Sequence, residues 1–401
     1  MGSKYNNNKN NQIGDELANL EKNNLYRTLK LVSVKGGTTA KVDHKENIIN
    51  LCSNDYLGLS HNQDILRETI LSLKQISQCS SRLIAGNAPK LVELEEMLAE
   101  HRGTEFSLIY PTGYMANLGV ITTLASKFAT ILSDELNHAS IIDGCRLSGA
   151  TIRVFKHNDI EHLEDLIKSV SDEKKIIVTE GVFSMDGDIS NLQKICDIAK
   201  EYNAITVVDD AHGDFIFGNS SASSSPFSGV PSYLEVNNNI DVHISSLSKG
   251  LGCFGGYVAT TKIIRELLIN KSRQFIYTSA LPEHLCSSAL AAIPKATKGN
   301  LQKKLFDNIE FMSKKLFRLG FRLGEKSTSQ IIPVIIGQEK TAIEFSNELL
   351  ENGIFVQAVR YPTVKKGSAR LRMSLTALHT KNQLIFAIDS FEKIGKKLKI
   401  I

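Results

Sequence analysis

Three short apolar segments of the chain are each followed at once by residues that can do chemistry. They are Ile176–Thr179 before Glu180, Ser184 and Asp186, Ile205–Val208 before Asp209, Asp210 and His212, and Val242–Ser245 before Ser246, Ser248 and Lys249. In open α/β sheets, ligands bind outside the carboxyl ends of the strands. A lysine, a histidine and carboxylates that meet there would form an active site, although Asp, Ser and Gly also end strands through turn chemistry alone.

Lys249 lies at the junction of two motif matches and allows a third interpretation. Gly250–Gly255 has the spacing G-x-G-x-x-G, but the strand-like Gly256–Thr260 follows where a dinucleotide site needs a helix. Ser246–Lys249 fits the S-x-x-K of penicillin-binding enzymes, whose companion motifs the sequence lacks. We therefore interpret Lys249 as a Schiff-base nucleophile, which must be activated because the ordinary lysine pKa of ~10.4 leaves the amine protonated.

The elements that must position these residues alternate along the chain from about residue 89. Leu91, Leu94 and Leu98 have helical spacing, and Ser190–Gln193 spells a capping box at the start of a later helix. The apolar runs that we interpret as buried strands are Phe106–Tyr110, Ile131–Leu132, Thr151–Phe155, Ile176–Thr179, Ile205–Val208 and Val242–Ser245. Alternation of this kind predicts an α/β domain with a mostly parallel sheet.

The chain divides into three parts. They are an N-terminal segment over residues 1–55, a large domain over 56–290 and a smaller α+β domain over 291–401. The first part begins with an Asn-rich stretch that we expect to be disordered, followed by a helix and by small paired strands at Thr38–Val42 and Ile48–Leu51. Gly218–Ser232 is rich in serine and predicts a surface loop.

Composition excludes several classes of protein. The 401 residues carry 47 Lys+Arg against 43 Asp+Glu, a net charge of +4 that is small for a dedicated nucleic-acid binder. No apolar run approaches the ~18 residues of a membrane span, and the N-terminus does not have the pattern of a signal peptide. The six cysteines are widely scattered, without close pairs typical of metal or redox sites. We expect a cytoplasmic protein without a metal, a nucleic-acid partner or a membrane.

Four segments together resemble the α-oxoamine synthases, pyridoxal-phosphate (PLP) enzymes of fold type I. They are Asn50–Leu59, Thr179–Asp188, Val208–Gly213 and Ser246–Gly252. The resemblance covers roughly residues 20–395 in order. It implies an α/β transferase fold with a large, mostly parallel domain and a smaller α+β C-terminal domain. It also implies bound PLP and a homodimer with shared active sites.

The resemblance implies a role for each matching residue at the cofactor. Lys249 would bind PLP covalently and move the α-proton of the substrate, while Asp209 would keep the pyridinium nitrogen protonated. His138 would stack on the ring and face the substrate. The other implied cofactor contacts are Gly113 and Tyr114 at a helix N-terminus, Ser184 and His212 at the phenolic oxygen, Ser246 at the phosphate, and Thr278 and Ser279 at the phosphate of the neighbouring subunit.

Substrate contacts are implied in the same way. Arg372 would clamp the carboxylate of the amino acid through its guanidinium fork. Arg370, two residues away, is expected to point to the opposite face of the strand. Arg27 matches a substrate-binding arginine, while Asn54 and Thr376 are substrate candidates that could equally be structural.

Within the family, the resemblance of the sequences of Asn50–Leu59 and Leu268–Pro282 favours one of the family's reactions. L-Alanine would condense with a pimeloyl thioester, on CoA or an acyl carrier protein, to give 8-amino-7-oxononanoate and CO₂ for biotin synthesis. The alternative is glycine with acetyl-CoA; transamination and a non-catalytic partner subunit are alternatives of other classes. Pro111–Thr112 and Asp214–Phe215 depart from the family pattern, and we expect them to reshape the acyl pocket.

Overall fold

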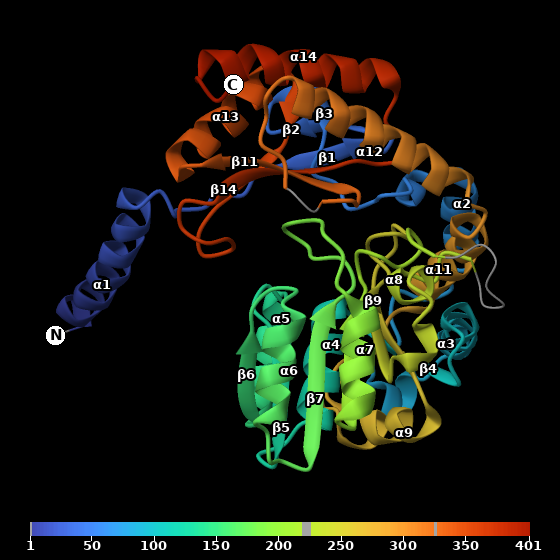
Figure 1. Ribbon diagram of the computed structural model, residues 1–401. Helices are drawn as coiled ribbons and strands as arrows, with labels where there is room; N and C mark the ends of the chain where they lie inside the picture. The colour runs from blue at the N-terminus through green and yellow to red at the C-terminus, as the bar shows by residue number, and fades with distance from the viewer. Residues whose placement is uncertain (1, 219–225, 325–326) are drawn as a thin grey trace.

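The computed structural model describes residues 2–218, 226–324 and 327–401. In Figure 1 the central sheet and its helices form the lower part of the molecule, and α12 to α14 with the smaller sheets form the upper part. Residues 219–225 of the predicted loop at 218–232 lie outside the described residues. Within the described ranges, no helix is both long and apolar enough to span a bilayer.

Seven strands form the central sheet, in the order β4-β10-β9-β8-β7-β5-β6. Their bounds are β4 Phe106–Tyr110, β5 Ala129–Asp134, β6 Thr151–Phe155, β7 Lys174–Glu180, β8 Ala204–Asp209, β9 Val242–Ser246 and β10 Gly256–Thr260. The pairings among β5, β6, β7, β8 and β9 are parallel, and β10 runs antiparallel to both β4 and β9. The predicted α/β fold with a mostly parallel sheet is confirmed.

Both faces of the inner strands of this sheet are buried. Consecutive residues of one strand, such as Ile176 and Ile177 or Val207 and Val208, belong to two different apolar clusters, one on each side. This explains why the strands read as unbroken apolar runs. The helices of this part of the chain are α3 Pro89–Arg102, α4 Gly113–Leu124, α5 Ala139–Ser148, α6 Ile160–Lys168, α7 Leu192–Glu201, α8 Val230–Tyr233, α9 Lys262–Lys271, α10 Arg273–Ile276 and α11 Glu283–Ala296, with short turns η2 Arg82–Gly86 and η3 Asn237–Asn239.

Two small sheets form the upper part of the molecule. One has the order β1-β2-β3-β12 and the other β11-β14-β13. The bounds are β1 Val32–Lys35, β2 Thr39–Val42, β3 Lys45–Asn50, β11 Ile331–Gly337, β12 Ile354–Phe355, β13 Gln357–Val359, β14 Ala369–Ser374, η1 Leu59–His61, α2 Gln63–Leu71, α12 Asn300–Arg318, α13 Glu339–Glu351 and α14 Lys381–Lys397. β2 and β3 pair antiparallel, which confirms the predicted strand pair, and β3 also pairs parallel with β12. The N-terminal strands therefore share a sheet with the C-terminal part of the chain.

Three local expectations were wrong. The Asn-rich start is helical, since α1 runs from Gly2 to Lys22 and projects from the body in Figure 1; asparagine lowers helix propensity only modestly, and no proline interrupts this stretch. The first four residues of β6 are exposed because this strand is the edge of the sheet. The helix after Ser190 is α7, whose N-cap is Asn191 without a side-chain cap bond, because the Ser190 hydroxyl contacts Thr179 instead.

Candidate active site

A cavity of about 230 Å³ lies at the carboxyl ends of β7, β8 and β9, beside the N-terminus of α4. It is lined by residues that the sequence singled out, namely Gly113, Tyr114, His138, Asp209, His212, Ser246 and Lys249, together with Thr112, Ser140, Glu180, Ala211, Ser248, Phe254 and Gly255. Strands that are parallel bring their carboxyl ends to one edge, which is why residues distant in sequence meet here.

Lys249 lies half-buried in this cavity, just after β9. Desolvation lowers the pKa of its ammonium below the ordinary lysine value, although Asp209 and Glu180 attract the charge and oppose the shift. A lowered pKa increases the share of neutral amine, which is the form that attacks a carbonyl carbon. Burial in the cavity therefore provides the activation of Lys249 that the sequence analysis called for.

Asp209 is held by a chain of polar side chains. Asn117 donates from Nδ2 to Asp209 Oδ2 at 2.6 Å and to Ser140 Oγ at 3.0 Å, and the backbone N–H of Ala211 donates to Asp209 Oδ1 at 3.0 Å. Ser140 Oγ in turn lies 2.8 Å from His138 Nδ1. Sequence reasoning missed Asn117, although it lies one helical turn after Gly113 on α4, a spacing that could have placed it on the same face.

Glu180 is a second carboxylate at the cavity, paired in register with Asp209 on the neighbouring strand. It is 2% exposed, and among the described residues its Oε1 has no hydrogen-bond partner. Burial and then the charge of Asp209 raise the pKa of Glu180 well above its usual value, while the backbone N–H groups of His138 and Ser184 oppose this. An orphaned buried oxygen in a cavity indicates a site built around a further polar group.

His212 is connected to the substrate candidates by a buried tyrosine. Tyr56 Oη lies 2.6 Å from His212 Nδ1 and donates to Asn54 Oδ1 at 3.1 Å. Arg372 donates to Asn54 Oδ1 at 3.3 Å and, from Nε, to the carbonyl oxygen of Ser184 at 2.6 Å. Burial, followed by the charges of Lys249 and Arg372, lowers the pKa of His212 well below its usual value, so the ring is neutral at pH 7.

The opposite end of the cavity suits a phosphate group. Ser246 Oγ and Ser248 Oγ lie 2.7 Å apart beside the start of α4, where Thr112 caps the helix by accepting from the backbone N–H of Met115 at 3.1 Å. A Cβ on Gly113 would lie 3.3 Å from the Cβ of Ser246, so a side chain there would crowd the cavity. Hydroxyls beside a helix N-terminus are a common anion site. Together with Lys249, Asp209 and the orphaned oxygen of Glu180, this set fits PLP.

Seven of the sequence candidates do not line this cavity. Ser184, Asn54 and Arg372 are three of them, and they form the hydrogen-bonded group described above. The other four lie elsewhere. Thr278 is half-buried and Ser279 exposed after α10. Arg27 is exposed and donates to Thr363 Oγ1 at 3.3 Å. Thr376 is fully buried in a turn, where its hydroxyl accepts from the backbone N–H of Leu378 at 3.0 Å.

One expectation about side-chain direction was wrong. Arg370 forms an ion pair with Asp186 and donates to the carbonyl oxygen of Met185 at 3.4 Å, so it faces the same loop as Arg372. Residues two apart on a strand share a face, which the expectation overlooked. Asp214 and Phe215, which we expect to affect the acyl pocket, are not among the residues that line this cavity, whereas Thr112 is. Asp214 accepts from Ser245 Oγ at 2.8 Å, and both residues are buried in the core.

Comparisons with known proteins agree on a family. The aminotransferase class I and II family matches residues 46–391. The 8-amino-7-oxononanoate synthases of Thermoanaerobacter pseudethanolicus and Petrotoga mobilis are 42% and 39% identical to this chain, covering 97% and 96% of it and 98% of each relative. Serine palmitoyltransferase from S. paucimobilis, solved with a bound PLP–myriocin aldimine, has a TM-score of 0.91 at 30% identity, covering 98% of this chain and 99% of that one. For 8-amino-7-oxononanoate synthase from Francisella tularensis the TM-score is 0.75 at 30% identity, with 88% and 99% covered.

Proposed function

This chain belongs to the α-oxoamine synthases within the aminotransferase class I and II family, and on that premise we propose that it makes 8-amino-7-oxononanoate from L-alanine and a pimeloyl thioester. It is a PLP-dependent acyltransferase. The observation that carries the proposal is the meeting of Lys249, Asp209, His138 and His212 in one cavity of a chain 42% identical to a synthase of that product. The proposed setting is biotin synthesis in the cytoplasm.

In the net reaction one carbon–carbon bond forms and two bonds break, and a proton removed from Cα before the condensation is returned to Cα after CO₂ leaves. The bond between Cα of alanine and its carboxylate breaks, releasing CO₂, and Cα bonds to the acyl carbonyl carbon. The C–S bond of the thioester breaks, and the thiol leaves with a proton. PLP, when bound, supplies an electron sink for the electron pair left at Cα.

The residues of the cavity fit the remaining tasks. We assign Lys249 Nζ to covalent attachment of the cofactor and to removal of the Cα proton of alanine, because it lines the cavity and its lowered pKa increases the share of the amine that can act as a base. Asp209, fixed by Asn117 and by Ala211 N–H, would keep a ring nitrogen protonated. His138 would cover the ring, and neutral His212 with Ser184 would contact its phenolic oxygen. Ser246, Gly113 and Tyr114 would take the phosphate.

Arg372 is proposed to bind the carboxylate of alanine. Its guanidinium is held on one side by the Ser184 carbonyl and on the other by Ser374 Oγ, to which it donates at 2.9 Å. Fixed donors in a fork suit a planar carboxylate. Asn54 lies beside it as a second contact, whereas Arg27 is proposed to meet the acyl donor from the surface.

A substrate matrix tests the proposal. Glycine, L-alanine and L-serine are each combined with acetyl-, pimeloyl- and palmitoyl-thioesters, the serine and palmitoyl arms being included because of the likeness to serine palmitoyltransferases. The expected result is the highest kcat/KM for L-alanine with the pimeloyl thioester. A tenfold preference for glycine with acetyl-CoA, which equals about 1.4 kcal/mol of transition-state preference, would refute it. Product formation without release of free thiol would indicate transamination instead.

Shared active sites can be tested by complementation. Thr278 and Ser279 lie outside the cavity of their own chain, and we propose that they complete the phosphate site of the second subunit in a homodimer. A mixed dimer of Lys249→Ala and Thr278→Ala/Ser279→Ala chains would then contain one intact site. Activity above that of either parent dimer is expected. Activity no greater than the parents' average would place both residues in their own chain's site or in none.

A further inference from the structure

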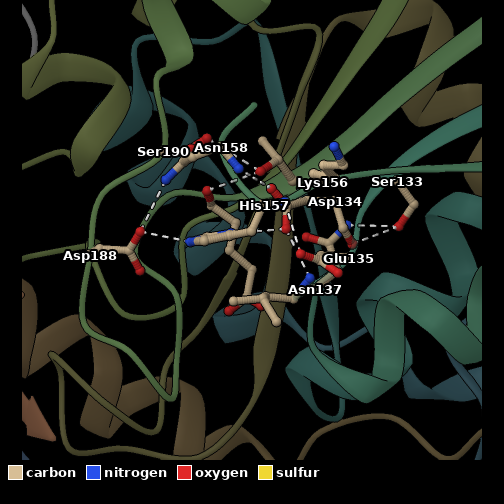
Figure 2. Close-up of polar contacts among 12 residues, drawn as sticks. Ser133, Asp134, Glu135, Asn137, Lys156, His157, Asn158, Asp188 and Ser190 are labelled. Atoms are coloured by element: carbon tan, nitrogen blue, oxygen red, sulfur yellow. Dashed lines mark hydrogen bonds and ion pairs between the residues drawn. The ribbon is translucent and has the colours of Figure 1, made fainter. Parts of the chain in front are cut away.

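Outside the cavity, His157 lies between two buried carboxylates (Figure 2). Its Nδ1 is 3.0 Å from Asp134 Oδ1 and its Nε2 is 2.8 Å from Asp188 Oδ2. Asp134 and Asp188 are 2% and 3% exposed. The ring lies edge-on to Phe183, with centroids 4.4 Å apart. Both ring nitrogens donate at once only in the imidazolium form, so this place selects a charged histidine.

The two carboxylates belong to the two segments that carry site residues. Asp134 ends β5 and accepts from the backbone N–H of Leu136 at 2.8 Å, which fixes the turn leading to His138. Asp188 lies at the base of the loop that carries Ser184, where its carbonyl accepts from the backbone N–H of Phe183 at 3.0 Å. His157 therefore connects the end of β5 to the base of this loop.

The tip of that loop touches the proposed substrate clamp. The carbonyl oxygen of Ser184 accepts from Arg372 Nε at 2.6 Å, and Asp186 pairs with Arg370 two residues earlier on β14. If the loop shifted at its base, the Ser184 carbonyl oxygen and the Asp186 carboxylate would both move away from their arginine partners. The orientation of the Arg372 guanidinium thus depends on contacts that begin at His157.

We propose that His157 is a positioning residue for the amino-acid carboxylate. It pins the loop of residues 181–190 to β5, so that the Ser184 carbonyl holds Arg372 in the orientation that binds the substrate. The inference rests on the proposed role of Arg372. It adds a residue that is not among the described residues that line the cofactor cavity.

The surroundings of His157 favour its charged form. Two groups of charged residues face His157 or its partners. The first comprises Asp134 at the end of β5, Glu135 after it, Lys365, which pairs with Glu135, and Asp188 on the loop. The second comprises Asp186, Arg370 and Arg322, which line a pocket that His157 also lines. Burial alone would lower the pKa of His157, but the two aspartates outweigh it and raise the pKa to about 10. The imidazole of His157 is therefore charged throughout the neutral pH range.

The test compares His157→Gln with His162→Gln, the same substitution at a histidine whose Nδ1 accepts from the backbone N–H of Lys156 at 3.0 Å. For His157→Gln we expect at least a tenfold rise in the KM for the amino acid, with the KM for the thioester within threefold. Spectral titration of the PLP-loaded protein with L-alanine should show the same loss. His162→Gln should stay within twofold of the wild type.

A rescue variant and an exchange measurement complete the test. In His157→Gln/Asp188→Asn, the glutamine amide can donate to Asp134 while its oxygen accepts from the new asparagine, so amino-acid affinity should partly recover; this variant also serves if the single one does not fold. Hydrogen exchange in residues 181–190 of the cofactor-free protein should rise in His157→Gln alone. Unchanged amino-acid affinity, or equal losses for both substrates and in thermal stability, would overturn the proposal. If the wild type rejects the pimeloyl thioester, the proposed reaction fails, yet the alanine titration still judges His157.

Discussion

Asp209 and Asp210 are consecutive residues with opposite surroundings. Asp209 faces the cavity at the end of β8, beside Lys249 and the orphaned oxygen of Glu180. Asp210 points to the other side of the sheet, where Arg102 Nη1 lies 2.9 Å from its Oδ2. The carboxylate of Asp209 therefore faces an open cavity, whereas that of Asp210 is surrounded by protein.

The enclosed side is packed around one cation. Arg102 is fully buried, and its Nη2 also lies 3.1 Å from Asp214 Oδ1. Burial would lower the pKa of the guanidinium, but Asp214, Tyr257 and Asp210 together raise it. A Cβ added to Gly213 would lie 2.1 Å from Asp210 Oδ1, so the glycine after His212 is required by packing rather than by the cavity.

The comparison separates two uses of buried charge. On the enclosed side the cation and carboxylates offset each other, and removing one leaves an uncompensated charge. Displaced pKa values occur on both sides, since burial raises the pKa of Asp210 to about 7 on the enclosed side and shifts those of Glu180 and Lys249 on the cavity side. What differs is that Glu180 and Lys249 line an open cavity, where displaced pKa values are typical of functional sites. We therefore expect substitutions on the cavity side to change activity and substitutions on the enclosed side to change stability.

The largest effect is expected at the cavity. Lys249→Ala removes both the covalent attachment and the proposed base, so kcat should fall by about 10⁴-fold or more. The melting temperature of the cofactor-free protein should stay near that of the wild type, because among the described residues Lys249 has no ion pair like those of Arg102 with Asp210 and Asp214. Turnover within tenfold of the wild type would contradict the assignment.

Arg102→Met is expected to do the reverse. It leaves Asp210 and Asp214 buried without their cation, at a cost of about 3–5 kcal/mol in the free energy of unfolding. Urea denaturation measures this loss. The folded fraction should retain a kcat close to the wild-type value. A variant that is as stable as the wild type but inactive would show that Arg102 acts in catalysis and not in stability.

A matched pair of variants sharpens the contrast at the neighbouring aspartates. Asp209→Asn removes the charge beside the proposed ring nitrogen and should lower kcat by about 10²-fold, equal to about 2.7 kcal/mol, with little change in stability. Asp210→Asn should lower stability and leave kcat within a few-fold. Steady-state kinetics and thermal melts of both variants measure these effects. A loss of kcat in Asp210→Asn with a loss of stability in Asp209→Asn would make Asp210 the cofactor partner.

The smallest effect is a pH dependence at His157. Its pKa rises from 6.5 to about 10 on folding, so its contribution to stability is complete below about pH 6.5 and is lost as pH rises toward 10. The melting temperature of wild type should exceed that of His157→Gln at pH 6.5, and the gap should narrow by about 2–4 °C by pH 9.5. A gap that stays constant would show that the ring is not charged in the folded protein.

The sequence was informative wherever chemistry follows an apolar strand directly. Lys249, Asp209 and His212 stand out because a parallel sheet gathers its carboxyl ends at one edge, and a strand buried on both faces is easy to recognise. Asn117 and Tyr56 were missed because a single amide in a helix, or a tyrosine in a loop, has no local pattern that distinguishes it from a core residue. Their roles exist only through contacts between distant segments.

Buried charge was harder still to predict. Arg102 ends α3, where a cation usually interacts with the helix dipole, and nothing local shows that it pairs with two carboxylates more than a hundred residues away. His157 likewise follows an edge strand and would be read as a turn residue. Long-range pairing of this kind depends on the packing of layers, which one sequence does not show.

The attachment site of the cofactor tests the central claim most directly. The purified protein is loaded with PLP, reduced with borohydride to make the linkage permanent, and digested for peptide mass spectrometry. We predict a single phosphopyridoxyl-modified peptide that contains Lys249, at near-stoichiometric yield, and none when Lys249→Ala is treated in the same way. Modification of another lysine at comparable yield, or modification spread over surface lysines, would contradict the account.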